Sequence, residues 1–270
     1  MLSLQEVEYT DRAANELRAV DWTDKLLQRF DQNGGSVSEN MPLMFEVRFA
    51  YELYLRGVEA QYEYSAGVED STIDFRVMSP QEWLIELVSV RESQGLQAAT
   101  EHHGFFWSRQ LSSDARDERQ SEEAEMIVAL AKITEKVYSA GKPTKFPMPS
   151  SAFHIVVVDM RGYLGEGGDG LDYSQMANGA LAIPEQEAPA RRFWRGEPIR
   201  GLFERVDGHP LKGATVAQKR IHFLAFVAES EFREGEIART LQFRPNPHLL
   251  TTRDRVQTAY RSFPLAYNAA

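Results

Sequence analysis

Apolar residues follow two different periods along the chain, and these periods predict the order of its helices and strands. Helical spacing predicts helices over about residues 10–30, 40–57 and 121–141. Alternating or continuous apolar runs predict strands over about residues 59–68, 71–78, 83–90 and 153–160. Short turns favour antiparallel pairing of the first three strands, whereas the helix before the last strand favours a right-handed crossover and parallel pairing. We therefore expect a mixed α/β fold built around one sheet.

The rest of the chain is expected to decorate this core. Residues 1–40 are predicted to form an N-terminal helix and linker, residues 41–164 the core, and residues 165–270 a C-terminal extension. Within the extension, residues 221–230 and 237–245 read as a β-hairpin at one edge of the sheet. A chain of 270 residues with 43% hydrophobic content can bury a sizeable core, so we expect one compact domain overall.

The hairpin over residues 73–90 carries an acid on each strand. A three-residue loop centred on Pro80 sets Asp74 opposite Glu86. Opposed residues on antiparallel strands have Cβ atoms about 4.5 to 5.5 Å apart, which suits two carboxylates that hold one cation. Glu86 interrupts a strand that is apolar on both faces, and a buried unpaired charge is costly. A cation is therefore expected beside it.

Alternation predicts which side chains of the first strand share a face. Ile73, Phe75 and Val77 should lie on one side of the sheet, and Asp74 and Arg76 on the other.

A third acid, Glu46, lies on the predicted helix over residues 40–57. At 100° per residue it falls in line with Leu53, in the middle of the inward-facing stripe. Glu52, on the same helix, lies four residues from Arg48 and is explained as one of a solvated helix pair.

Each acid also has an explanation that requires no functional site. Glu46 could reach solvent at a helix end, and Glu86 could meet a buried arginine. Asp74 could pair with Arg76 or Arg91. Together, however, three acids on faces that should be covered favour a shared cation.

Composition limits the kinds of functional site that the chain can contain. The absence of cysteine excludes disulfides, thiolate metal sites and cysteine nucleophiles, and makes the cytoplasm the default location. A net charge of −10 argues against bulk electrostatic coating of nucleic acid but allows a local basic groove. We expect no signal peptide and no membrane segment. P-loop, HExxH and GxSxG motifs are absent from the sequence.

The order of these features resembles the PD-(D/E)XK nuclease superfamily over residues 42–160. EVRFAYELYLRG corresponds to the first core helix of the family, TIDF to its Pro-Asp segment, and ELV to its Glu-x-Lys segment. The resemblance implies a restriction-endonuclease-like core of order α-β-β-β-α-β and metal-dependent hydrolysis of phosphodiester bonds in DNA or RNA.

The resemblance also implies roles for the acids. Glu46, Asp74 and Glu86 would be the catalytic residues. Asp74 and Glu86, with a backbone carbonyl of Leu87 or Val88, would hold Mg²⁺ or Mn²⁺. Glu46 would bind a second ion or a metal-bound water.

The chain departs from the family at the lysine that orients the attacking water, because Val88 stands in its place. Candidate replacements are Arg91 on the same strand and Lys132 and Lys136 on the following helix, since some family members carry the lysine on a neighbouring helix. Relative to the stripe that begins at Ile127, however, both lysines project away from the expected core, which favours solvated side chains.

A basic and aromatic segment in the C-terminal extension could contact nucleic acid or, alternatively, form a surface loop anchored by tryptophan. Its residues are Arg191, Arg192, Phe193, Trp194 and Arg195. We therefore expect a cytoplasmic metal-dependent nuclease, acting as a homodimer or within a larger assembly. The alternatives are an inactive nuclease-fold module that binds nucleic acid or protein, which Val88 and the acidic charge favour, and an unrelated αβ scaffold.

Overall fold

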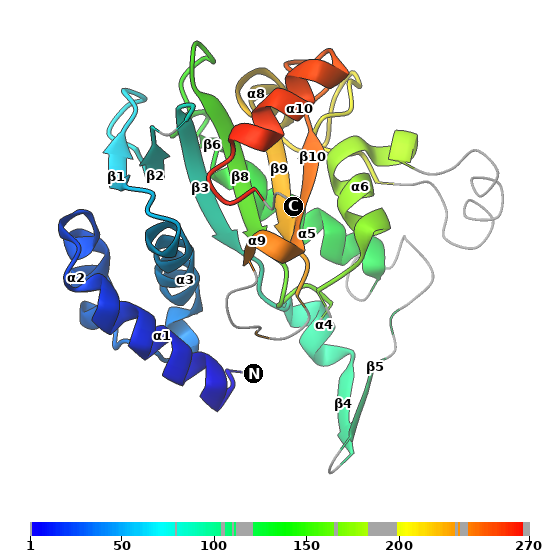
Figure 1. Ribbon diagram of the computed structural model, residues 1–270. Helices are drawn as coiled ribbons and strands as arrows, with labels where there is room; N and C mark the ends of the chain where they lie inside the picture. The colour runs from blue at the N-terminus through cyan, green and yellow to red at the C-terminus, as the bar shows by residue number, and fades with distance from the viewer. Residues whose placement is uncertain are drawn as a thin grey trace.

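A six-stranded mixed sheet lies at the centre of the computed structural model (Figure 1), which describes residues 2–78, 80–103, 106–109, 111, 121–164, 167–182, 199–229, 232 and 237–266. In spatial order its strands are β1 (Ala60–Ser65), β2 (Thr72–Val77), β3 (Trp83–Ser89), β8 (Phe153–Asp159), β9 (Phe223–Val227) and β10 (Leu241–Pro245). β3, β8 and β9 are parallel, and the remaining neighbours are antiparallel. The predicted mixed α/β sheet is confirmed, including the parallel pairing of β8 and the antiparallel pair β9–β10 at the edge.

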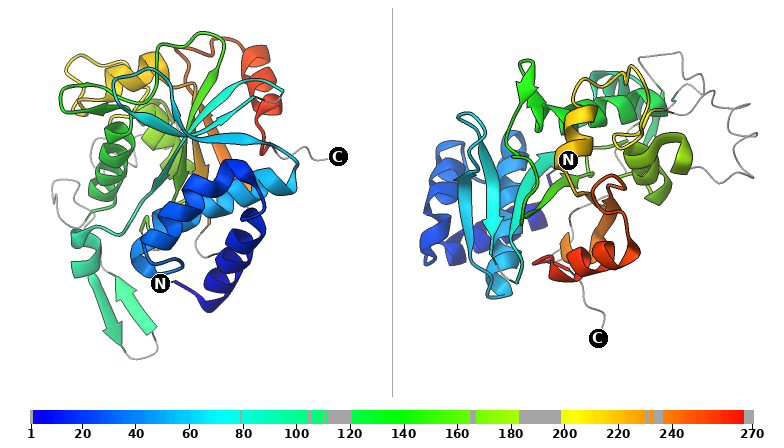
Figure 2. Two further views of the ribbon diagram at one scale, coloured as in Figure 1. Left: turned by 90° about the vertical axis from the view of Figure 1, so that its left-hand side faces the viewer. Right: turned by 90° about the horizontal axis from the view of Figure 1, so that it is seen from above.

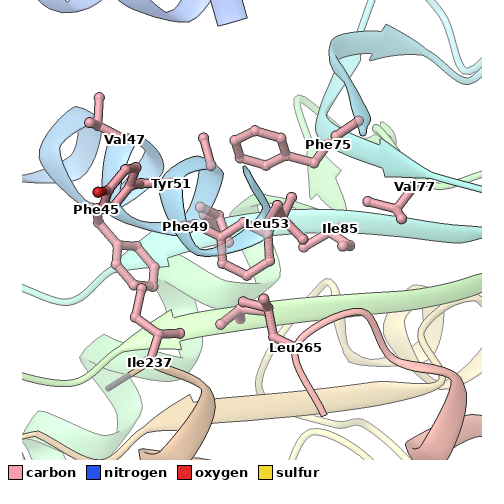
Figure 3. Close-up of a cluster of buried hydrophobic side chains, with 14 of the residues drawn as sticks. Phe45, Val47, Phe49, Tyr51, Leu53, Phe75, Val77, Ile85, Ile237 and Leu265 are labelled. Carbon is pink, nitrogen blue, oxygen red and sulfur yellow. The ribbon is translucent and has the colours of Figure 1, made fainter. Parts of the chain in front are cut away.

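Helices cover both faces of this sheet (Figure 2). One face carries α1 (Leu4–Leu17), α2 (Asp24–Gln32) and α3 (Met41–Leu55), and the other carries α5 (Glu122–Glu135), α6 (Gly170–Asn178) and α8 (Ala214–Arg220). Each face has its own buried apolar cluster. α10 (Arg253–Ser262) contributes to the cluster on the α3 face. In this cluster Phe49 packs against Phe75 of the sheet, while Phe45 points towards Ile237 (Figure 3).

Shorter elements connect this framework. α4 (Gln94–Ala98) leads into the hairpin of β4 (Thr100–His103) and β5 (Phe106–Arg109), which projects from the body of the molecule (Figure 1). The other short elements are β6 (Tyr138–Ser139), β7 (Lys142–Pro143), α9 (Ile237–Thr240) and 3₁₀ turns at Asp21–Thr23, Ser38–Asn40 and Gly179–Ala182. Within the described part of the chain, no helix has the length and apolar character that crossing a bilayer requires.

The N-terminal region differs from the single helix predicted over residues 10–30. Two helices, α1 and α2, are separated by the 3₁₀ turn Asp21–Thr23. The hydroxyl of Thr23 donates to the carbonyls of Leu17 and Val20, at 2.7 and 2.8 Å, and so ties the turn to the end of α1. The N–H of Val20 donates to the carbonyl of Leu17 at 2.9 Å, a bond over three residues that tightens the last turn where the helix ends.

α3 begins after Asn40 and ends before Gly57, as predicted, but two of its polar residues were misplaced. Arg48 is buried and donates to both carboxylate oxygens of Glu229 at 3.1 and 3.2 Å. Glu52 is also buried and accepts from the backbone N–H groups at the start of α9. The predicted solvated pair is wrong because the C-terminal segment covers this side of α3.

A second buried ion pair lies close by, at the end of β8. Arg161 contacts Asp159 at 2.7 Å and also binds Glu6 of α1. Removing one partner of a buried pair leaves an uncompensated charge, which costs about 3 to 5 kcal/mol. Arg161 therefore fixes α1 against the sheet.

Two histidines form a buried neutral pair on β8 and at the start of β9. The backbone N–H of His154 donates to Nδ1 of His222 at 3.0 Å, and Nδ1 of His154 donates to the carbonyl of Arg220 at 2.7 Å. An Nδ1 that accepts a hydrogen bond carries no proton, so His222 is neutral in this arrangement. Burial lowers the pKa of His154 to about 4, and burial together with His154 lowers the pKa of His222 to about 3.

We predict that this pair makes folding sensitive to acid. Both folded-state pKa values lie below the ordinary value of about 6.5, so the unfolded chain binds more protons and stability falls as pH decreases below that value. Each imidazole should cost about 2 kcal/mol at pH 5 relative to pH 7.5. Urea unfolding of wild type and His222→Asn, which keeps an acceptor but does not titrate, should show a smaller acid loss in the variant. An equal loss in both proteins would contradict the assignment.

Candidate active site

The backbone pairing of β2 with β3 ends where the two acids begin. The last pair is Phe75 with Ile85, and the same register continued by one residue sets Asp74 opposite Glu86, as predicted. Beyond this pair, the carboxylates of the two acids accept hydrogen bonds from backbone N–H groups in place of backbone carbonyls. The N–H of Asp74 donates to Oε2 of Glu86 at 3.4 Å, and the N–H of Leu87 donates to Oδ2 of Asp74 at 2.7 Å.

β2 also changes face at this point. Phe75 and Val77 pack in the cluster on the α3 face, but Ile73 packs in the cluster on the α5 face, so the strict alternation predicted for this strand is wrong. On β1, Glu63 has a φ of 48°, a left-handed conformation that is uncommon for a residue other than glycine. The distortion of both strands lies beside Asp74.

Glu46 approaches the hairpin from α3 and is largely covered. Its Oε2 accepts from the hydroxyl of Tyr62 at 2.6 Å and lies 3.9 Å from Nη1 of Arg29. Burial, and then the charge of Asp74, raises the pKa of Glu46 to about 8. Glu46 is 8% exposed, Asp74 7% and Glu86 0%, so all three predicted acids are buried.

Two lysines neutralise Glu86 from the α5 side. Nζ of Lys136 lies 2.8 Å from Oε1 of Glu86, and Nζ of Lys145 lies 2.5 Å from the same oxygen. Lys145 is also 3.9 Å from Oδ1 of Asp74. Burial and the charge of Asp74 raise the pKa of Glu86 to about 7, although both lysines act in the opposite direction.

The expectation that Lys136 is a solvated side chain is wrong. Leu130, Ile133 and Val137 of the predicted stripe are buried, but the inward face of α5 is rotated away from Ile127 and towards Met126. Ile127 is 50% exposed, whereas Met126 and Ala129 are buried. This rotation brings Lys136, just beyond the last turn, to the sheet. Lys145 was not predicted from the sequence. This residue follows the two short strands after α5, and nothing in the sequence indicated that it contacts the acids.

A pocket of about 280 Å³ lies over this cluster. Residues of α3, the end of β3 and α5 line it: Pro42, Phe45, Glu46, Leu87, Val88, Ser89, Lys132, Glu135 and Lys136. α3 and α5 cover opposite faces of the sheet, so the two helices can share a pocket only where the sheet is open. The end of β2–β3 pairing provides that opening.

Of the other predicted cations, Arg76 and Arg91 pair outside the acid cluster, and Lys132 lies at the pocket. Arg91 donates to the backbone carbonyl of Glu39 at 2.8 Å, and Arg76 pairs with Glu82 at 2.7 Å. Lys132 lines the pocket. The predicted nucleic-acid segment, with Arg191, Arg192, Trp194 and Arg195, lies outside the described residues.

The acids supply a sparse set of ligands. In the described ranges, no group of three or more His, Cys, Asp or Glu side chains is close enough to hold a metal ion. Asp74 and Glu86 are joined by hydrogen bonds through the backbone, while Glu46 is held apart by Tyr62. Any ion between Asp74 and Glu86 would therefore draw its remaining ligands from backbone, water or substrate.

No family model, curated protein or solved structure matches this chain. Function must therefore be inferred from the chemistry of the site itself.

We predict that Glu46 makes the metal-free protein less stable at alkaline pH. Its folded-state pKa is raised, so its contribution to stability is complete below the ordinary pKa of about 4.5 and is lost as pH rises through about 8. Between pH 6 and pH 8.5 this loss should be about 2 kcal/mol. Urea unfolding in a chelating buffer should show a flatter pH dependence for Glu46→Gln, which still accepts from Tyr62. A slope equal to that of wild type would refute the buried, protonated Glu46.

Proposed function

We propose that the chain is a divalent-metal-dependent nuclease that hydrolyses phosphodiester bonds in DNA or RNA, with Lys136 in place of the missing strand lysine. The main support is the environment of Lys136. Burial lowers its pKa, but the charges of Glu86, Asp74 and Glu46 outweigh this effect and raise the pKa above its ordinary value. One cation from the end of α5 thus interacts with acids from two strands and another helix.

The arrangement of elements also supports a restriction-endonuclease-like core. α3, β1, β2, β3, α5 and β8 follow one another in the order of that core, with α4 and short hairpins inserted, and β8 pairs in parallel with β3. The acids lie on the helix, the second strand and the third strand of this series, as the resemblance requires. A cytoplasmic location stays part of the proposal.

Asp74 on β2 and Glu86 on β3 form a pair of carboxylates that fits a hard divalent cation such as Mg²⁺ or Mn²⁺. Mg²⁺ is commonly held by one or two carboxylates together with phosphate oxygens and waters, which matches the sparse set of Asp74 and Glu86. The ammonium of Lys145 beside both carboxylates shows that this position attracts positive charge. The N–H and C=O of one strand residue point to the same side, so the carbonyl of Leu87 faces the gap and that of Val88 faces β8.

When bound, the ion would neutralise charge on the phosphate and lower the pKa of water. The protein supplies the remaining groups. Lys136 lines the pocket, where its ammonium can offset charge that develops on a phosphate. Glu46 also lines the pocket, and a carboxyl with a pKa of about 8 is suited to take up or release a proton near neutral pH.

The alternative, an inactive nuclease-fold module, is favoured by one observation. Two lysines already neutralise the innermost acid, Glu86, without any metal. Such a module would bind no Mn²⁺, whereas the proposed enzyme must bind it, so calorimetry with Mn²⁺ distinguishes the two.

We predict metal-dependent cleavage of single-stranded or double-stranded DNA or RNA by the purified protein. Asp74→Asn and Glu86→Gln should each abolish cleavage, because each removes a charged ligand. Lys136→Met should lower the rate by about 100-fold, the order of magnitude of one electrostatic donor. Product formation on end-labelled substrates with Mg²⁺, Mn²⁺ or a chelator provides the measurement.

Two controls change the same charges outside the site. Glu82→Gln alters an acid of the same hairpin that pairs with Arg76, and Lys142→Met alters a lysine that pairs with the exposed Glu69. Both should cleave at the wild-type rate. If no substrate is cleaved with either metal, or if cleavage survives Asp74→Asn, the proposed function is wrong.

A further inference from the structure

Lys145 lies between two acids that the proposed function assigns to a metal ion. Its Nζ is 2.5 Å from Oε1 of Glu86 and 3.9 Å from Oδ1 of Asp74. A single ammonium group thus contacts one carboxylate directly and lies within Coulombic range of the other. Its side chain is 22% exposed, so a route to solvent exists.

The backbone of Lys145 has a conformation that residues other than glycine rarely adopt. Its φ is 60°, and the N–H of Phe146 donates to the carbonyl of Thr144 at 2.7 Å across it. A three-residue turn with positive φ at its centre is rare and strained. Such strain persists only where the surrounding structure enforces it, and it gathers at functional sites.

The flanking contacts show how the turn is enforced. The N–H of Lys145 donates to the hydroxyl of Ser71, just before β2, at 2.8 Å. Phe146 is fully buried, and its carbonyl accepts from Arg220 at 2.5 Å. The position of the Lys145 backbone is therefore fixed from both sides, while its side chain is a flexible stem with a compact charge.

Lys136 and Lys145 are not equivalent, although both contact the same oxygen of Glu86. Lys136 lines the pocket, where a substrate phosphate would lie, and Lys145 is not among the lining residues. Lys145 instead approaches Asp74 and Glu86 together. Lys136 is therefore placed to contact a substrate, whereas Lys145 is placed to contact the two acids that would bind the metal ion.

We propose that Lys145 is an internal cation that occupies the metal position between Asp74 and Glu86, and that a divalent ion must displace its ammonium group to bind. The inference rests on the proposed function, because that function makes these two acids the ligands. Lys145 then stabilises the metal-free site and sets the metal concentration at which the site fills. On displacement, its stem carries the charge towards solvent while the turn stays in place.

The test measures Mn²⁺ binding, not cleavage. Lys145→Met removes the charge and keeps the length of the side chain. Lys142→Met is the matched control, because it lies in the same segment, makes the same change in net charge and pairs only with the exposed Glu69 among the contacts described. Isothermal calorimetry should show that Lys145→Met lowers the Kd for Mn²⁺ by about tenfold or more, since a competing charge about 4 Å away is removed. Lys142→Met should leave Kd unchanged.

Melting temperatures provide a second readout that does not depend on metal affinity alone. In a chelator, Lys145→Met should melt at a lower temperature than Lys142→Met, because Glu86 then keeps only one of its two lysines. Added Mn²⁺ should raise the melting temperature of Lys145→Met more than that of wild type. Lys145→Arg, which keeps the charge, should bind Mn²⁺ no more tightly than wild type.

The outcomes separate this inference from the proposed function. If wild type cleaves nucleic acid but Lys145→Met binds Mn²⁺ no more tightly, the inference is wrong and the nuclease proposal stands. If only Lys145→Met binds Mn²⁺, the inference holds and wild type is not a metal-dependent nuclease under those conditions. If neither protein binds Mn²⁺, both proposals are wrong.

Discussion

The charge of Glu86 constrains everything around it. This carboxylate lies fully covered on β3, between β2 and β8, where an isolated charge would be prohibitively costly. Two lysines and a backbone N–H stabilise it, and each reaches it because the ladder between β2 and β3 stops one residue earlier. The opening in the sheet, the pocket above it and the two lysines are thus structurally connected, because all three lie where the protein stabilises the buried charge of Glu86.

That arrangement also places basic side chains in a pocket of an acidic chain. The net charge of −10 is spread over the whole protein, but the pocket contains Lys132 and Lys136 beside Glu46. Short-range fields inside a pocket are screened much less by salt than those between distant surface charges. Local charge balance, more than the total, therefore decides what the pocket can hold.

The sequence was sufficient for features that depend on local rules. Turn length and apolar alternation set the register that places Asp74 opposite Glu86, and helix-boundary residues located α3 between Asn40 and Gly57. The parallel pairing of β8 followed from the helix that precedes it. These features follow from turn chemistry, from helix-boundary residues and from the order of consecutive elements.

Features set by distant segments could not be predicted in the same way. The rotation of α5 that brings Lys136 to Glu86 depends on what covers Ile127 and Met126, and the partners of Arg48 and Glu52 come from beyond residue 228. Lys145 gave no signal because its strained turn uses a residue with no preference for positive φ. Ile73 changed face because the strand distorts beside an acid, which alternation does not anticipate.

The buried pair of Arg48 and Glu229 has a consequence for the order in which the chain matures. Its two residues are separated by 181 positions, whereas Asp74 and Glu86 are only 12 apart. During translation, at about 5 to 20 residues per second, the acidic hairpin leaves the ribosome well before Glu229 exists. The ion pair between Arg48 and Glu229, and the cover that it gives to this side of α3, can therefore form only after residue 229 has been made.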